Sequence, residues 1–181
     1  MTATYLVLNG PQATTAAPTS QPTGTAVRTM LQLAPLASGA PIKIIEWGCS
    51  FDASAAATPG KVELFACTGA ATMSTALAAA DVMPYGSRLD YPANTAGTSG
   101  SPLSLGTALS GFATAAVTEG TVANMRMFDL QLLPPTSPYL KQFPLGREPQ
   151  LGGNSATQEF LRVRVTFGAS VNAYVYVAFE V

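Results

Sequence analysis

The sequence has no histidine and carries little charge. Among 181 residues, nine are lysine or arginine and ten are aspartate or glutamate, so charged residues make up 10% of the chain, where about 25% is usual. Without histidine there is no imidazole general base, no Ser-His or Cys-His nucleophile pair and no imidazole metal ligand. A net charge of −1 also offers no clustered basic patch for phosphate backbones. We therefore expect a non-enzymatic protein with no cofactor and no nucleic-acid partner.

Long hydrophobic runs are absent too. The first apolar run, residues 5–8, is too short for the core of a signal peptide, and no run approaches the roughly 20 residues of a membrane helix. We expect a soluble chain, made in a cytoplasm, with no membrane partner. Two cysteines, Cys49 and Cys67, are no disulfide framework. They could pair, but buried thiols are favoured, because free cysteine behaves as a small core residue.

What the sequence does contain is the alternation of apolar and polar residues that is typical of half-buried β-strands. Clear strands are expected at 27–33, 42–47, 61–67, 124–133, 159–167 and 172–181, and weaker ones at 4–8, 111–117 and 139–143. Many short strands with turn signals between them predict a single all-β domain over residues 1–181. The expected architecture is an antiparallel β-sandwich, jelly-roll-like in its connections.

The two C-terminal strands alternate most clearly. Their short link, residues 168–171, predicts that they pair as an antiparallel hairpin. Arg162 and Arg164 share the face opposite the apolar one, which indicates a solvated, half-exposed strand face more than a contact for an acidic partner. The one helix candidate is 74–80, which Ser74 could cap; a buried strand of small residues is the alternative.

Three long segments separate the strands, and we expect them to form ordered loops or arms. Residues 9–26 carry no charge, residues 84–111 are glycine-rich, and residues 134–153 contain five prolines. Loops longer than about 12–15 residues are usually binding segments or disordered. An arm that meets nucleic acid must be cationic, so the uncharged segment 9–26 is not expected to do so.

The proline-rich segment 134–153 holds the candidate partner-contact residues. Four of these are large and apolar, and the fifth is an arginine suited to a bidentate contact with a carboxylate: Tyr139, Leu140, Phe143, Leu145 and Arg147. Proline lowers the entropy that is lost when an arm is pinned on a partner. Two interpretations stay open: an extended arm over another subunit, or a loop that covers an open edge of its own sandwich.

Other candidates for chemistry have simpler structural interpretations. Glu46 and Glu63 are the best available glycosidase-like pair, but cross-strand ion pairs with Lys43 and Lys61 are favoured. Trp47 is expected in the core more than as a sugar-stacking platform. Asp81 and Asp90 lack EF-hand spacing, so solvated loop carboxylates are favoured over calcium ligands.

Several phrases of the sequence resemble those of a known group of viral proteins. They are IIEWGCSFD (44–52), PGKVEL (59–64), PLGREP (144–149) and FLRVRVTF (160–167) with YVYV (174–177). Together they resemble head proteins of tailed bacteriophages, in particular small β-sandwich decoration proteins, also called cement or minor capsid proteins. This resemblance implies a subunit, often a homotrimer, on the outer surface of the virion, where it clamps neighbouring major capsid proteins. It brings no catalytic residues with it.

The leading hypothesis is therefore a virion structural protein that binds and reinforces a capsid. One alternative is a carbohydrate- or receptor-binding β-sandwich module of a fibre or spike, which predicts exposed aromatics gathered on one edge; Tyr85, Tyr91 and Tyr139 are the loop candidates. The other is a single-jelly-roll coat protein, which would assemble into shells by itself.

Overall fold

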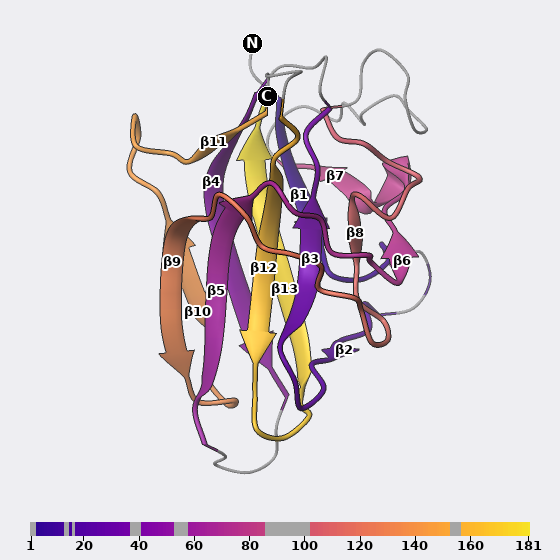
Figure 1. The fold of residues 1–181 in the computed structure, drawn as a ribbon, viewed down its shortest axis with the longest axis vertical. Coiled ribbons are helices and arrows are strands. Elements are labelled where there is room, and N and C mark those ends of the chain that lie inside the picture. The colour runs from indigo at the N-terminus through magenta and orange to yellow at the C-terminus, as the bar shows by residue number, and fades with distance from the viewer. Residues whose placement is uncertain are drawn as a thin grey trace.

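The structure is a computed structural model that describes residues 3–12, 15, 17–36, 41–52, 58–85, 102–152 and 157–181. These residues form an all-β antiparallel sandwich of two sheets, as the alternation predicts (Figure 1). The jelly-roll connectivity stays a prediction. The glycine-rich loop expected at 84–111 lies outside the described residues from 86 to 101.

The first sheet, called sheet A below, has seven strands. Its order is β10 (Tyr139–Gln142), β4 (Ile42–Phe51), β13 (Asn172–Glu180), β1 (Thr4–Leu8) and β7 (Val82–Pro84), with β11 (Gln150–Leu151) also paired to β4 and β2 (Gln21–Pro22) paired to β13. The second sheet, sheet B, has six strands. Its order is β6 (Thr75–Ala76), β8 (Gly111–Phe112), β3 (Arg28–Leu33), β12 (Phe160–Thr166), β5 (Gly60–Cys67) and β9 (Arg126–Leu133).

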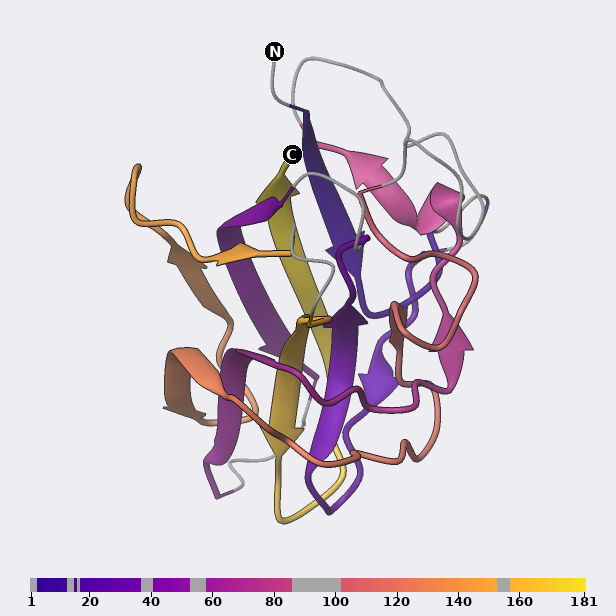
Figure 2. The same cartoon turned by 45° about the horizontal axis from the view of Figure 1, so that its top comes forward.

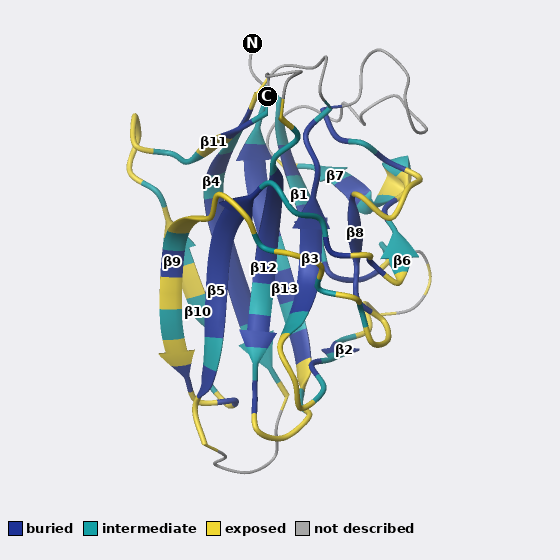
Figure 3. Ribbon diagram, in the orientation of Figure 1, coloured by how far each residue is buried: buried dark blue, intermediate teal, exposed yellow. Residues whose placement is uncertain are grey.

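One hydrophobic core fills the space between the sheets, and the alternating strands supply it. Val163 and Val165 of β12 and Val175 and Val177 of β13 are all buried in this core, and both strands are buried over most of their length (Figure 3). Trp47 is fully buried in the same cluster, which confirms its core role. Each aliphatic or aromatic side chain of this kind stabilises the fold by about 1.5–3 kcal/mol when it leaves water.

The predicted hairpin between the last two strands is wrong. β12 pairs with β3 and β5 in sheet B, whereas β13 pairs with β1 and β4 in sheet A. The link 168–171 therefore crosses from one sheet to the other. Both strands turn an apolar face to the same core, and this produces the same sequence pattern as two paired neighbours in one sheet.

The helix candidate 74–80 is wrong as well. Thr75–Ala76 form β6, which pairs with β8, and Ala79–Asp81 form the three-residue 3-10 turn η1. The Ser74 hydroxyl donates to the carbonyl of Phe112 at 3.3 Å, so this side chain holds two strands together instead of capping a helix. In the part of the chain that the structure describes, no helix is long and apolar enough to cross a membrane.

Two of the long segments fold back on their own sandwich. Within 9–26, β2 pairs with β13, and the Asn9 side chain donates to the Ala173 carbonyl at 3.0 Å. Within 134–153, β10 and β11 both pair with β4. The proline-rich segment therefore lies along an edge of its own sandwich, and its contact with another subunit stays a prediction. Its prolines lie outside β10 and β11, and proline, which has no N–H to donate to a sheet ladder, is tolerated at edges and strand ends.

The Arg162/Arg164 stripe is not a solvated face, which corrects that prediction. Residues 113–125, called the strap below, cross the outer side of sheet B in front of β12 and β3 (Figure 1). Arg162 is fully buried beneath the strap and forms an ion pair with Glu119. Both groups also bond to Thr29: the arginine Nε donates to its hydroxyl at 3.0 Å, and the hydroxyl donates to the carboxylate at 2.7 Å.

The strap gives a first testable prediction. Replacing Glu119 with alanine leaves Arg162 buried without a counter-charge, and we expect this to lower the free energy of unfolding by about 3 kcal/mol. Glu148→Ala is the control, because Glu148 forms no ion pair among the described residues, and its effect should stay within about 0.5 kcal/mol. Urea denaturation of the two variants measures the difference. Equal effects would contradict the assigned role of the ion pair.

Candidate docking surface

One side of the sandwich is built from two edge strands, one from each sheet. β9 ends sheet B and β10 ends sheet A, and the short connection 134–138 joins them. The two strands lie side by side at the same margin of the molecule in both views (Figures 1 and 2). This margin is called the β9/β10 side below.

A buried carboxylate links the two sheets along this side. Four side-chain donors converge on Asp129 of β9: Trp47 Nε1 at 3.2 Å, Tyr139 Oη at 2.8 Å, Gln131 Nε2 at 2.9 Å and Lys141 Nζ at 3.2 Å. Tyr139 and Lys141 belong to β10, and Trp47 belongs to β4. The two sheets are thus tied to each other through one side chain.

A β-bulge points this carboxylate inward. β9 pairs Met127 with Phe65 and Asp129 with Leu64, so Phe128 is the extra residue. After the bulge the faces of β9 are exchanged. Asp129 turns to the interior beside Leu64, whereas Leu130 and Leu132 face outward opposite Glu63 and Lys61.

The electrostatics of Asp129 follow from these contacts. Burial by itself would raise its pKa, but hydrogen bonds from Gln131, Tyr139 and Lys141, together with the lysine charge, outweigh burial and lower the pKa. The pKa of the Tyr139 phenol is raised to about 12, mainly because the group is buried and also because it donates a hydrogen bond to Asp129. The ionised carboxylate and the neutral phenol are therefore the forms that the fold stabilises.

The bulge at Phe128 and the side chains of Asp129 and Lys141 also hinder the pairing of another strand with the edge of sheet B. The outward amide of Leu130 donates to the Asp129 carboxylate at 3.0 Å, and Lys141 Nζ donates to the Phe128 carbonyl at 3.4 Å. Bulges and inward charges are two ways in which natural sheets prevent edge-to-edge pairing. The bulge and these two contacts therefore disfavour the pairing of another strand with the middle of β9.

The side chains exposed on the β9/β10 side are largely apolar. In the described part of the chain, nine large hydrophobic side chains are exposed, and six of them lie between residues 125 and 145 (Figure 3): Met125, Met127, Leu130, Leu132, Leu140 and Leu145. Leu132 is 72% exposed and Leu145 is 97% exposed. Leu130 and Leu132 face outward from sheet B, whereas Leu140 lies on the outer face of sheet A. Exposed apolar side chains on neighbouring edge strands are candidates for contact with a partner.

The five sequence-predicted contact residues divide into two groups. Leu140, Leu145 and Arg147 are exposed on the β9/β10 side. Tyr139 packs on Trp47 with ring centroids 5.4 Å apart, and Phe143 packs against the core, so both serve the fold first. Sequence reasoning missed Leu130 and Leu132, because plain alternation cannot show which way they point after a bulge.

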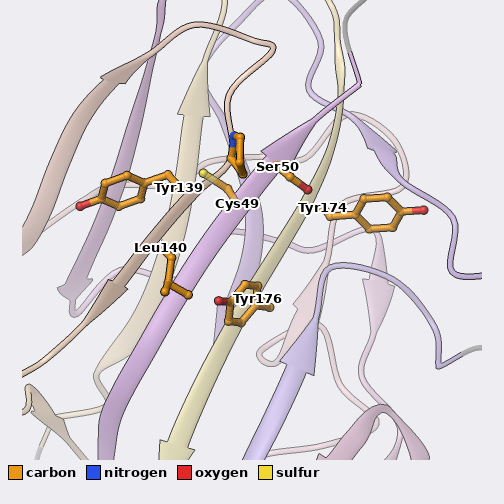
Figure 4. Close-up of a pocket in the computed structure, with 7 residues that line it drawn as sticks. Cys49, Ser50, Tyr139, Leu140, Tyr174 and Tyr176 are labelled. Atoms are coloured by element: carbon orange, nitrogen blue, oxygen red, sulfur yellow. The ribbon is translucent and has the colours of Figure 1, made fainter.

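A pocket of about 260 Å³ opens on the outer face of sheet A beside Leu140 (Figure 4). Tyr174 and Tyr176 of β13 form its opposite wall. The Tyr176 ring lies over Gly48, where an added Cβ would be 2.5 Å from a ring carbon. Glycine at this position therefore lets the ring lie against the sheet.

The other chemical candidates are not brought together. Glu46 is on β4 in sheet A and Glu63 is on β5 in sheet B. Glu63 pairs with Lys61 of its own strand at 3.5 Å and with Arg164 of the neighbouring β12 at 2.8 Å. None of the ion pairs among the described residues joins Glu46 to Lys43, so the predicted cross-strand pairs with these lysines are wrong. Asp81 accepts hydrogen bonds from the backbone amides of Gln12 and Ala78, and Asp90 lies outside the described residues.

The two thiols and the candidate sugar-binding tyrosines do not form a site either. Cys49 and Cys67 are free and buried, as expected, and burial followed by the nearby charge of Asp129 raises the pKa of Cys49 to about 12. Among the described residues, no three His, Cys, Asp or Glu side chains could share a metal ion. Of the three tyrosines that the carbohydrate hypothesis relied on, Tyr85 is exposed, Tyr139 is half-buried and Tyr91 lies outside the described residues.

Comparisons with protein-family models, with curated proteins and with solved structures find no match to this chain.

The Asp129 cluster predicts how stability depends on pH. Because the folded pKa of Asp129 lies below its unfolded value, its contribution is present above about pH 4 and is lost as the pH falls through the folded pKa. Asp129→Asn should therefore be less stable than the parent by about 2 kcal/mol at pH 7, and this gap should narrow at acidic pH.

Urea midpoints measured between about pH 7 and pH 2.5 test this expectation. Asp52→Asn is the matched control, because Asp52 is exposed and accepts hydrogen bonds from neutral groups such as Ser20. A pH-independent gap for Asp129→Asn would show that the ionised carboxylate does not supply the stability.

Proposed function

We propose that this chain is a non-enzymatic structural protein of a tailed-bacteriophage virion. It docks on the outer surface of the capsid and reinforces contacts between major capsid proteins. The observation that carries the proposal is the β9/β10 side itself, where exposed leucine and methionine side chains stand on two edge strands and a bulge interrupts β9. The resemblance of the sequence to capsid decoration proteins supports the same function.

The chemistry of this surface suits a permanent, uncharged contact. A standard protein interface buries about 1,600 Å² in total, and its affinity comes from a few well-packed apolar side chains. Exposed leucines such as Leu130 and Leu132 can supply such anchors. Many copies on a symmetric shell add avidity when their contacts are linked. The strength of an apolar contact of this kind depends little on salt.

Binding to capsid shells tests this function. Shells of the virus that encodes the chain, prepared without it, are mixed with the purified protein and sedimented. The double variant Leu130→Ser/Leu132→Ser should bind at least about tenfold more weakly than the parent, because it loses two anchors. About 0.5 M salt should change the affinity of the parent little.

Leu109→Ser is the matched control, because Leu109 is an exposed leucine next to β8, on the far side of sheet B from β9. Its affinity should equal that of the parent. If the parent does not sediment with the shells, or if Leu109→Ser is impaired as much as the double variant, the proposed docking surface is wrong. Shells formed by the chain alone would identify it as a coat protein instead.

A further inference from the structure

A rigid turn projects one leucine from the edge of sheet A. Between β10 and β11 the chain leaves the edge, and the Arg147 amide donates to the Pro144 carbonyl at 2.9 Å. Gly146 has a φ of 82°, the left-handed conformation that the third residue of a type II turn requires. Leu145 occupies the second position of this turn and is 97% exposed. The turn therefore holds the backbone at Leu145 in a defined conformation, which lowers the entropy that binding costs.

The pocket beside Leu140 is suited to an apolar side chain. Its three tyrosines are already hydrogen-bonded through their hydroxyls: Tyr139 donates to Asp129, Tyr174 to the Pro18 carbonyl and Tyr176 to Glu46. The pocket consequently offers ring faces and the Leu140 side chain more than free polar groups. A sugar would need free donors and acceptors at this site, whereas a leucine side chain needs only the apolar walls.

The charges next to these two features are complementary. Glu46 is only 7% exposed, and its oxygens accept from two neutral donors, Tyr176 Oη at 2.9 Å and Gln142 Nε2 at 2.7 Å. None of the ion pairs among the described residues involves Glu46. Arg147, two residues after Leu145, is exposed and likewise forms no ion pair within the described chain. Guanidinium groups bind carboxylates strongly.

From this pairing of shape and charge we propose that Leu145 of one copy inserts into the pocket beside Tyr176 of a second copy, and that Arg147 then binds Glu46 there. The assignment rests on the proposal that the β9/β10 side is a docking surface, and it names the partner of one part of that side. The outward face of β9, with Leu130 and Leu132, stays available for the shell.

Two variants that each remove one half of this contact test the inference. Leu145→Asp removes the projecting side chain, and Leu140→Asp places a charge at the pocket wall. Leu140 is 56% exposed, so neither variant disturbs the core. Light scattering from about 1 µM to about 500 µM protein measures self-association. The parent should form a discrete oligomer, and each variant should remain monomeric.

Mixing the two variants separates loss of this contact from misfolding. Leu145→Asp keeps an intact pocket and Leu140→Asp keeps an intact Leu145, so an equimolar mixture should form a heterodimer that neither variant forms alone. Arg147→Gln should weaken parent self-association about tenfold. Leu109→Asp, an exposed leucine away from both features, should assemble as the parent does.

A monomeric parent over the whole concentration range would overturn the inference, as would a Leu145→Asp variant that assembles normally or a mixture without heterodimers. Shell binding is measured separately with the Leu130→Ser/Leu132→Ser variant. A parent that is monomeric but binds shells would refute only the contact between copies. A parent that forms the oligomer but does not bind shells would refute only the capsid function.

Discussion

The contact on which the β9/β10 side depends is the convergence of donors on Asp129. This carboxylate belongs to the edge of sheet B, yet its partners Tyr139 and Lys141 belong to the edge of sheet A and Trp47 lies in the core between them. A buried charge is tolerated only when it is paired and hydrogen-bonded. Asp129 therefore fixes the distance between the two edges and holds the bulge at Phe128 in place.

The outward leucines are a consequence of the same bulge. When Asp129 turns inward, Leu130 and Leu132 must turn outward, because successive side chains of a strand alternate between the two faces. The exposed apolar surface and the closed edge thus arise together. An apolar strand with an open edge would invite pairing between copies, whereas here the bulge and Lys141 prevent it. The leucines can then serve side-chain contacts with a chosen partner.

Most strands could be predicted from the sequence, because burial on one face imposes a period of two wherever the ladder is regular. The pairing of the strands could not be predicted. β12 and β13 line one core from opposite sheets, and their sequences alternate in the same way as those of two strands paired in one sheet. The outward direction of the Leu130 side chain depends on one inserted residue, Phe128, which alternation does not reveal. The burial of Arg162 depends on the strap, which covers it from another part of the chain. The exposure of Leu140, Leu145 and Arg147 could be predicted because their proline-rich segment was expected at an edge; their contact with a partner stays a prediction.

Hydrogen exchange of the chain, free and bound to capsid shells, tests most directly whether the β9/β10 side is the docking surface. If it is, backbone amides between residues 126 and 133, in β9, should exchange at least about tenfold more slowly on the shell, since contact suppresses local opening. Amides at residues 105–112, on the far side of sheet B, should be unchanged. Slower exchange at 105–112 with no change at 126–133 would contradict the account.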